Sequence, residues 1–456
     1  MTSAQFSPRP ALRTVQLRLK PAVLAVAVLA WGSMASAQAQ SLVELYNAAK
    51  GQDAALQAAQ AQLQAAEAKG EQAKAGLRPQ AGLSAGANWS NMDTSLSSTS
   101  KGVNNQNVAL VASQPLYRPI NGLNSQQGQL GFDIARAQLD AAEQDLIVRT
   151  AQAYFDVVAA QDSLTFVQAQ KKAVAEQLAA AKTNFEVGTT TVTDSREAQA
   201  RFDLVTAQEI ASANDLRVKG LALDQLVGKT DASPKPLAAK VSLPALPDTG
   251  AEVWVSQALK QHPTVQQLNN AYDIAELEVL KAQAGHKPTV DLVGQYQIVH
   301  APSSSYPAAG NFRTSTASIG VQLNLPLFAG YAIQNRVKET MALVEKANAD
   351  REAAVRTLSQ GIRSAYFGVL SGQSQVKALE AAEASSQSAL EANQLGYQVG
   401  VRINIDVLNA QSQLFQTKRD LAQARYNVLV GQLRLKQASG ALKAEDLNGI
   451  NALLKP

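Results

Sequence analysis

The spacing of apolar residues changes several times along the chain, and each spacing predicts a different element. Residues 41–77 carry leucine and alanine at helical intervals, and residues 121–185 do so over a long run that no proline interrupts. Residues 81–91 and 108–112 instead alternate apolar and polar side chains. Apolar residues three or four positions apart favour an amphipathic helix, whereas alternation favours a strand with one apolar face. The first half therefore predicts helix, strand, strand and long helix, with a loop rich in Ser, Thr and Asn over residues 91–105 and a shorter returning helix over 193–227.

The second half repeats this order. Residues 251–285 predict a helix, residues 290–298 and 319–327 predict two strands around a loop at 301–313, and a long and a shorter helix follow. Ala365-Tyr366-Phe367 matches Ala153-Tyr154-Phe155 at a spacing of 212 residues. Self-similarity at one fixed spacing indicates a duplicated unit. The expected organisation is a signal peptide (1–39), a first structural repeat (40–228), a proline-rich connector (229–250), a second structural repeat (251–440) and a C-terminal segment (441–456).

Each long helix is expected to turn back at a short tip. The first tip reads FEVGTTTVTD at residues 185–194, and the second reads YQVGVRINID at residues 397–406. Gly188 and Gly400 are 212 residues apart, as are Asp194 and Asp406. In each tip we expect a Val-Gly pair to end one helix and the aspartate to cap or open the next. The recurrence of the tip at the repeat spacing supports a duplicated chain.

Composition indicates an exported protein. Residues 1–39 combine a basic start, an apolar run too short to span a membrane, and small residues that fit cleavage after Ala37 or Ala39. An uncleaved anchor is the alternative. This leader holds four of the 41 basic residues and none of the 37 acidic ones, so residues 40–456 have a net charge of zero. Such a balance gives no reason to expect a nucleic-acid partner. The chain has no cysteine, which excludes disulfides, thiolate metal sites and cysteine nucleophiles.

The alternating strands bear on where the protein resides. The clearest apolar series is Ile319, Val321, Leu323, Leu325 and Leu327, with Ser, Gly, Gln and Asn among the intervening residues. Apolar-out, polar-in alternation is typical of outer-membrane barrels, and an ordinary half-buried sheet is the alternative. No run of eighteen apolar residues exists, so a membrane location would require a barrel. Bacterial barrels have about eight strands or more, so four strands require oligomerisation: two chains would supply eight strands and three would supply twelve.

The mature chain, residues 40–456, resembles the TolC family of outer-membrane channel-tunnel proteins. The motifs that carry the resemblance are Ala153-Tyr154-Phe155, Phe185-x-Val187-Gly188, Thr193-Asp194, Gly285-His286-x-Pro288-Thr289, Gly396-Tyr397-x-Val399-Gly400, Asp406-Val407-Leu408 and Leu421-Ala422-x-Ala424-Arg425-Tyr426-Asn427. The resemblance implies a mainly α fold with β. A long periplasmic α-helical coiled-coil barrel would join four strands per protomer of a shared, trimeric, twelve-stranded outer-membrane β-barrel.

The resemblance also implies a function without chemistry. A homotrimer in outer-membrane lipid would be the exit duct of a tripartite efflux or type I secretion system. It would dock a periplasmic adaptor, or membrane fusion protein, and an inner-membrane transporter of RND or ABC type. The cargo would be small molecules or proteins, and no cofactor is expected.

The tip residues take their roles from the same resemblance. Tyr397 and Arg402 resemble residues that hold the periplasmic entrance shut, and Thr193 and Asp194 resemble their partners on the neighbouring coil. An Arg402–Asp194 pair would give a charge-assisted lock of about 1–3 kcal/mol. Asp406 resembles a pore-facing carboxylate at the constriction, where a ring of acids favours cations.

The chain departs from the family pattern at one position of the constriction. Asn409 stands where related tips can carry a second acid, so one acidic ring is expected instead of two. The alternatives are that Asp194 and Asp406 only cap helices and that Tyr397 only packs against the coil.

Other functional classes find little support in the residues. His262, His286 and His300 are scattered without a second ligand at metal spacing, and no nucleophile elbow, phosphate loop or dinucleotide fingerprint occurs. An enzyme is therefore not expected. The remaining competitor is a non-pore periplasmic coiled-coil adaptor or structural rod, which would share the export signal and the long helices but would not need the four alternating strands.

Overall fold

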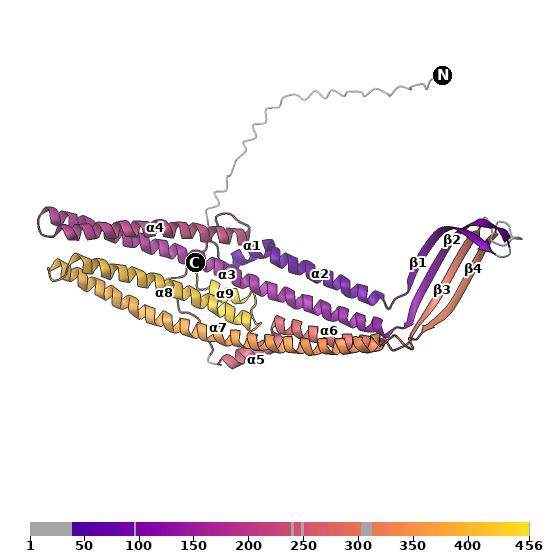
Figure 1. Ribbon diagram of the computed structural model, residues 1–456. Coiled ribbons are helices and arrows are strands. Elements are labelled where there is room, and N and C mark those ends of the chain that lie inside the picture. Colours follow the sequence, from indigo (N-terminus) through magenta and orange to yellow (C-terminus); the bar gives the residue numbers. More distant parts are fainter. Residues whose placement is uncertain (1–38, 95–96, 239–240, 248–249, 302–311, 456) are drawn as a thin grey trace, which may run out of the picture. The chain divides into compact units, whose positions relative to one another are not determined.

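Each half of the chain folds as two helices, two strands, a long helix and a returning helix (Figure 1). The computed structural model describes residues 39–94, 97–238, 241–247, 250–301 and 312–455. The expected signal peptide lies outside these residues, except for Ala39. The first half contains α1 (Leu42–Gln52), α2 (Ala54–Ala75), β1 (Gln80–Thr94), β2 (Ser97–Tyr117), α3 (Pro119–Glu186) and α4 (Val192–Val227). The second contains α5 (Ala251–Gln261), α6 (Pro263–Ala284), β3 (Thr289–Ala301), β4 (Phe312–Asn324), α7 (Ala332–Gln398), α8 (Asn404–Ala438) and α9 (Asp446–Asn451).

The helix that precedes the strands is broken in both halves, where the sequence predicted one continuous helix. Asp53 leaves the helical conformation, and its carboxylate accepts a hydrogen bond from the Leu56 amide at 2.7 Å, which caps α2. His262 is extended because it precedes Pro263, and its ring nitrogen accepts from the Thr264 amide at 3.1 Å. A capped break costs little here because each new helix start finds a side-chain partner.

The long helices organise the rest of the helical part. α3 packs against α2 and α4 on one side and against α6 and α8 on the other, and α7 packs against α6 and α8. The shorter helices are therefore stacked along the two long ones, as Figure 1 shows. Within the described residues, no helix has the length and apolar character needed to cross a membrane.

The four strands form one antiparallel sheet in the order β1-β2-β3-β4. The expected loop at residues 91–105 is mostly strand, since β1 runs to Thr94 and β2 begins at Ser97, with Met92 paired to Lys101. Main-chain hydrogen bonds carry this pairing, so the missing alternation misled the prediction. Of the second expected loop, residues 302–311 lie outside the described residues and the rest is strand, whereas β4 ends at Asn324, three residues before the predicted end.

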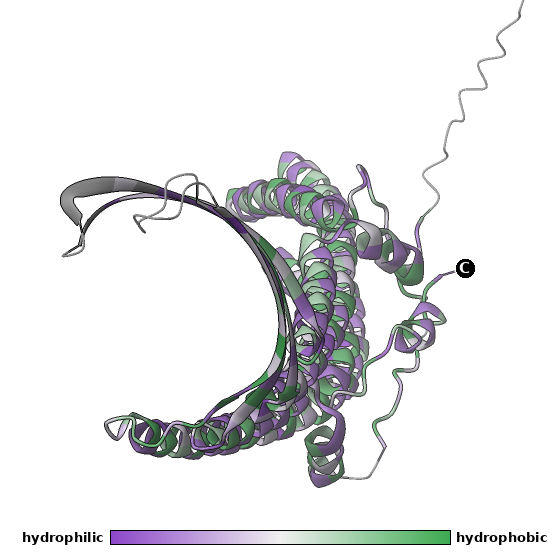
Figure 2. Cartoon of the chain, turned by 90° about the vertical axis from the view of Figure 1, so that its right-hand side faces the viewer, coloured by the Kyte–Doolittle hydropathy of each residue, from purple (hydrophilic) through white to green (hydrophobic). Residues whose placement is uncertain are grey.

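The strand register brings apolar side chains together on one face of the sheet. Leu83 is opposite Leu110, and Leu110 is opposite Tyr296. All three side chains are exposed, as are Ile319 and Val321 on β4, the former at 80%. The sheet is curved and is a single layer (Figure 2). Monomeric soluble proteins rarely expose contiguous apolar surface of this kind, so the face requires lipid or another chain.

An ion pair between an exposed arginine and a buried aspartate fixes the sheet to the helices. Arg118, directly before α3, donates two hydrogen bonds of 2.7 Å to the two carboxylate oxygens of Asp291 on β3. Asp291 is 7% exposed. A bidentate pair has a defined geometry, so it sets the direction in which α3 leaves the sheet.

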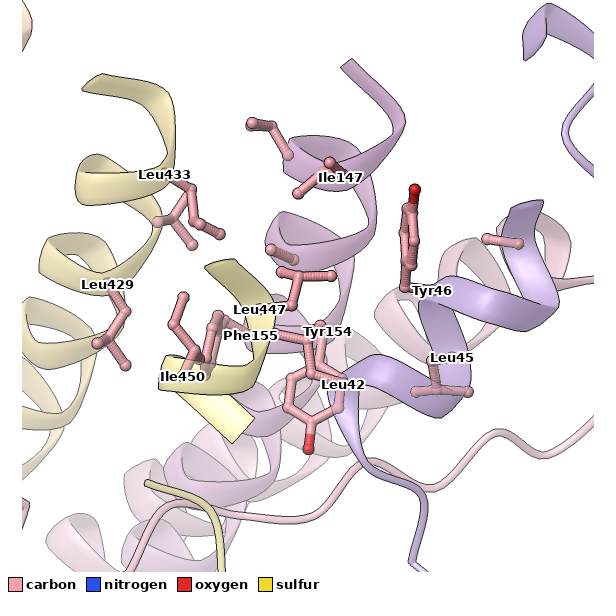
Figure 3. Packing of buried hydrophobic residues seen from close by; sticks show 14 of the residues in the cluster. Leu42, Leu45, Tyr46, Ile147, Tyr154, Phe155, Leu429, Leu433, Leu447 and Ile450 are labelled. Atoms are coloured by element: carbon pink, nitrogen blue, oxygen red, sulfur yellow. The ribbon is translucent and has the colours of Figure 1, made fainter. Parts of the chain in front are cut away.

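The largest apolar core lies where the two halves meet. Tyr154 and Phe155 of α3 are buried, and the Phe155 ring stacks on Tyr426 of α8 with ring centres 5.5 Å apart. Leu42 of α1 and Leu447 of α9 belong to the same cluster (Figure 3), which also takes in residues of α2 and α4. The Tyr154 hydroxyl donates to the Lys235 carbonyl at 2.7 Å, which attaches the connector to this core.

A charged network links α3, α6 and α7 nearer the sheet. The Glu278 carboxylate accepts hydrogen bonds from Lys281 at 2.8 Å, from Gln127 at 3.0 Å and from Arg336 at 2.9 Å. These bonds, Lys281 first, lower the pKa of Glu278 to about 2. A depressed carboxyl pKa means that the ionised group stabilises the fold above its ordinary pKa of 4.5, and that this contribution is lost as the pH falls towards 2.

We expect Glu278→Gln to destabilise the protein by about 1–3 kcal/mol at neutral pH, because two cations lose their partner. Thermal unfolding followed by circular dichroism would measure the difference, and the two melting curves should converge as the pH falls from 4.5 towards 2. Glu339→Gln is the matched control, since Glu339 also pairs with Arg336 but is more than half exposed. A difference that does not depend on pH would contradict this account of Glu278.

Candidate functional site: the two helix tips

Both tips turn through a glycine in the left-handed conformation. Gly188 has φ of 75° and Gly400 has φ of 80°, a region that other residues rarely adopt. The Thr189 amide donates to the Asn184 carbonyl at 2.9 Å, and the Val401 amide donates to the Gly396 carbonyl at 2.9 Å. These bonds satisfy carbonyls at the ends of α3 and α7, so each Val-Gly pair ends its helix as predicted.

Asp194 belongs to a capping box whose N-cap is Thr191. The Thr191 hydroxyl accepts from the Asp194 amide at 3.3 Å, and the Asp194 carboxylate accepts from the Thr191 amide at 3.1 Å. Each aspartate therefore opens its helix and does not cap it, which is one of the two roles expected from the sequence. Thr191 caps α4, whereas Ile403 precedes α8 without a side-chain cap, and Asp406 lies in the first turn of α8. The Thr-x-x-Asp spacing was the signal for Thr191.

Arg402 and Asp406 form an ion pair within the second tip. The Arg402 Nη1 atom is 3.6 Å from the Asp406 Oδ2 atom, four residues along the chain. The aliphatic part of Arg402 lies over Gly396, where an added Cβ would come within 2.6 Å of the Arg402 Cγ atom. The described chain thus pairs Arg402 with Asp406, while the Asp194 carboxylate bonds to Thr191. The expected Arg402–Asp194 contact is not an interaction of the single chain.

Polar contacts connect the two tips. The Asn184 amide nitrogen donates to the Tyr397 hydroxyl at 3.4 Å, and Arg201 donates to the Asn409 side-chain oxygen at 2.8 Å. Asn404, which is 1% exposed, donates to the Asp194 carbonyl at 3.5 Å. Sequence reasoning missed Asn404 and Arg201, since their partners lie about two hundred residues away in sequence.

The tip residues otherwise divide by exposure. Thr193, Arg402 and Asn409 are exposed, whereas Tyr397 and Asp406 are partly buried. Within the described part of the chain, no group of three His, Cys, Asp or Glu side chains could hold a metal ion. The tips thus place charged and hydrogen-bonding side chains at the end of the long helices.

The chain is similar to known proteins over most of its length. Two segments of the chain, residues 45–229 and 254–441, match the model of the family described as outer membrane efflux protein. The outer membrane protein TolC of Vibrio cholerae serotype O1 is 32% identical over 430 residues, which cover 93% of this chain and 97% of that protein. The proteases secretion protein PrtF of Dickeya chrysanthemi is 28% identical, with 94% of each chain covered. Among solved structures, the CmeC outer membrane channel of Campylobacter jejuni superposes with a TM-score of 0.77 at 17% identity, covering 92% of this chain and 91% of that one.

The chain thus combines a curved sheet that carries an exposed apolar face with helical hairpins of about 100 Å. The two matched segments correspond to the two halves of the fold, as expected for an internally repeated chain. The chain belongs to the outer membrane efflux protein family. It is an outer-membrane exit duct for efflux or type I secretion and not an enzyme, which excludes the non-pore rod considered from the sequence.

The difference between the two tips can be tested directly. Thr191→Ala should remove the α4 cap at a cost of about 1 kcal/mol and raise amide exchange in the first turn of α4 about fivefold. Ile403→Ser should do the reverse for α8, because serine at this uncapped position can accept from a first-turn amide. Hydrogen exchange by mass spectrometry measures both changes. Equal exchange in the Thr191→Ala variant and the parent would mean that the capping box does not hold the tip.

Proposed function

We propose that three copies of the chain assemble into a passive pore in the outer membrane. In the described residues, β1 and β4 each pair with a strand on one side only, so the sheet has two open edges. An open edge exposes unpaired backbone groups that hydrocarbon cannot satisfy. Joining β4 of one copy to β1 of the next removes every edge, and three copies supply twelve strands, as the family resemblance implies.

The observation that carries this proposal is the register-matched apolar face. Leu83, Leu110 and Tyr296 lie side by side across three strands and are 73%, 49% and 47% exposed. In a closed twelve-stranded barrel this face would meet lipid, and the Gln and Ser side chains of the other face would line a water-filled lumen. The helices would then continue the duct into the periplasm.

The partners follow from the class of duct. A passive pore needs an energy source elsewhere, so we propose docking to a periplasmic adaptor and to an inner-membrane transporter of RND or ABC type. The name of the Dickeya relative refers to protease secretion. Small molecules or secreted proteins are the corresponding cargo classes for this chain.

We propose that the tips close the periplasmic entrance. Thr193, Asp194, Tyr397 and Arg402 would hold neighbouring copies together, and Asp406 and Asn409 would line the constriction. The 3.6 Å Arg402–Asp406 pair adds a feature of this chain, since each arginine offsets the charge of its own pore carboxylate. Both groups are partly exposed, so the pair is weak and can exchange partners.

Membrane fractionation followed by planar-bilayer recording tests the pore. The purified protein should sediment with outer membranes, run as a trimer in detergent, and conduct ions in discrete steps. A protein that is monomeric in detergent and never conducts would refute the proposal.

Asp194→Ala combined with Arg402→Ser should raise single-channel conductance several-fold and increase the preference for cations, because the lock is removed and Asp406 loses its counter-charge. Adding Asp406→Asn should keep the high conductance and abolish the added cation preference. Arg356→Ser is the control, since it breaks an exposed pair with Glu352 far from the tips. Unchanged conductance in the double variant would mean that these residues are not the gate.

A further inference from the structure

The apolar face of the sheet ends in basic side chains. Successive residues of a strand point to opposite faces, so every second residue of β4 shares the face of Ile319. In the direction away from the helices, these residues are Leu323, Val321, Ile319, Ala317, Ser315 and Arg313. The same series on β3 runs from Val290 through Tyr296 to His300. Each of the two strands thus carries one basic residue on this face, and that residue is the last of its series.

The strand register places these side chains in one row. His300 is opposite Arg313 on β4 and opposite Gln106 on β2. Neighbouring strands are about 4.8 Å apart, so the row spans about 10 Å across three strands. Gln106 and Arg313 are exposed, and His300 is partly buried. All three side chains can donate hydrogen bonds. We call Gln106, His300 and Arg313 the donor row.

The donor row has no counter-charge in its own strands. Asp291 is the only acidic residue in the sequence of β2, β3 and β4, and it bonds to Arg118 at the other end of the sheet. Among the described residues, none pairs with a side chain of the donor row. Like charges directly opposite one another on a sheet repel, so a protonated His300 beside Arg313 favours an anion from outside the chain.

The length of β3 places the donor row at the edge of a lipid bilayer. β3 begins after α6 and ends at Ala301, so His300 lies at the end of the sheet away from the helices. From Val290 to His300 the strand rises about 34 Å, at about 3.4 Å per residue. A barrel strand tilted by about 40° would cover about 26 Å of the membrane normal, and the lipid-facing band of such barrels is about 25 Å tall.

This position suits the chemistry of the donor row. A charged side chain on the lipid face is costly at the bilayer midplane and is tolerated near the boundary. Trp89 lies one pair beyond the row on the same face of β1 and is 71% exposed, and tryptophan is enriched at membrane boundaries. The head groups of lipids also lie there, and the arginine fork matches the oxygens of a phosphate.

We propose that the donor row binds the phosphate group of an anionic lipid in the outer leaflet of the membrane. This inference rests on the proposed function, because the face meets lipid only if the barrel closes. Arg313 would hold two phosphate oxygens, and His300 and Gln106 would donate to the others. The acyl chains would lie along Ile298 and Ile319 of the same face, so a lipid phosphate is favoured over a free one.

Native mass spectrometry of the full protein in detergent tests the binding. The parent should retain dioleoyl phosphatidic acid about tenfold more than dioleoyl phosphatidylcholine, because only the former presents an unshielded phosphate to the row. His300→Gln combined with Arg313→Gln should lower the retention of phosphatidic acid to that of phosphatidylcholine. Equal retention of phosphatidic acid by the parent and the double variant would overturn the inference.

Two further variants separate a site from a general charge effect. Arg356→Gln removes an exposed cation of α7 and should leave the retention of phosphatidic acid unchanged. Arg313→Lys keeps the charge but loses the fork, so its retention should lie between those of the parent and the double variant. A loss in Arg356→Gln as large as that in the double variant would mean that net charge, and not the donor row, attracts the lipid.

Inorganic phosphate distinguishes the lipid from a soluble anion. At the same concentration as the lipid it should not displace phosphatidic acid from the parent, because it makes no contact with the apolar face. Displacement at equal concentration would show a site for free phosphate and would overturn the assignment to a lipid.

Fluorescence tests the proposed function separately from the donor row. Trp254→Phe leaves Trp89 as the only tryptophan of residues 40–456. In vesicles of phosphatidylcholine with brominated acyl chains, the emission of Trp89 should be quenched. An unquenched Trp89 would refute the proposed barrel and the inference with it. A quenched Trp89, together with equal retention of phosphatidic acid by the parent and the double variant, would refute the donor row alone.

Discussion

The packing of Phe155 against Tyr426 is the contact on which the rest of the structure depends. It is where the long helix of the first repeat meets the returning helix of the second, inside a core that also takes in α1 and α9. The two halves meet elsewhere through the strand pair β2–β3, the α3–α6 contact and the side-chain hydrogen bonds between α3 and α8. This core lies between the sheet and the helix tips, and the two ends of the chain differ in character. The sheet presents an apolar face, whereas the tips present charged side chains. Loss of this core would remove the main apolar contact between α3 and α8.

Much of the fold could be read from the sequence because its period is strict. The 65-residue helical run and the four alternating segments required no tertiary information, and the repeat supplied each assignment twice. The predictions were wrong where tertiary contacts outweighed the local sequence pattern. Strand pairing overrode the polar composition around Met92, since backbone bonds do not depend on side-chain alternation. The helix break at His262 could have been predicted from the proline that follows it. The helix break at Asp53 could not, because an aspartate within a helix is common.

The sequence likewise predicts some features of the tips and not others. Gly188 and Gly400 could be placed because left-handed turns demand glycine. The partner of Arg402 could not, since the carboxylate that it meets within the chain is Asp406, only four residues further on. Asn404 carried no signal, although it is among the most buried polar residues of the chain. Its importance comes from Gln177 on a distant segment, and one sequence without its fold cannot reveal such pairs.

The two one-sided strands at the margins of the sheet have a consequence for biogenesis. A newly exported chain presents β1 and β4 as templates that any extended segment could occupy, next to an apolar face that water does not tolerate. In the proposed assembly, closure is a meeting of several identical chains, so its rate would rise steeply with their concentration, whereas mispairing with another polypeptide involves only one copy. Keeping β1 and β4 covered until the copies meet would therefore favour the closed duct over mispairing.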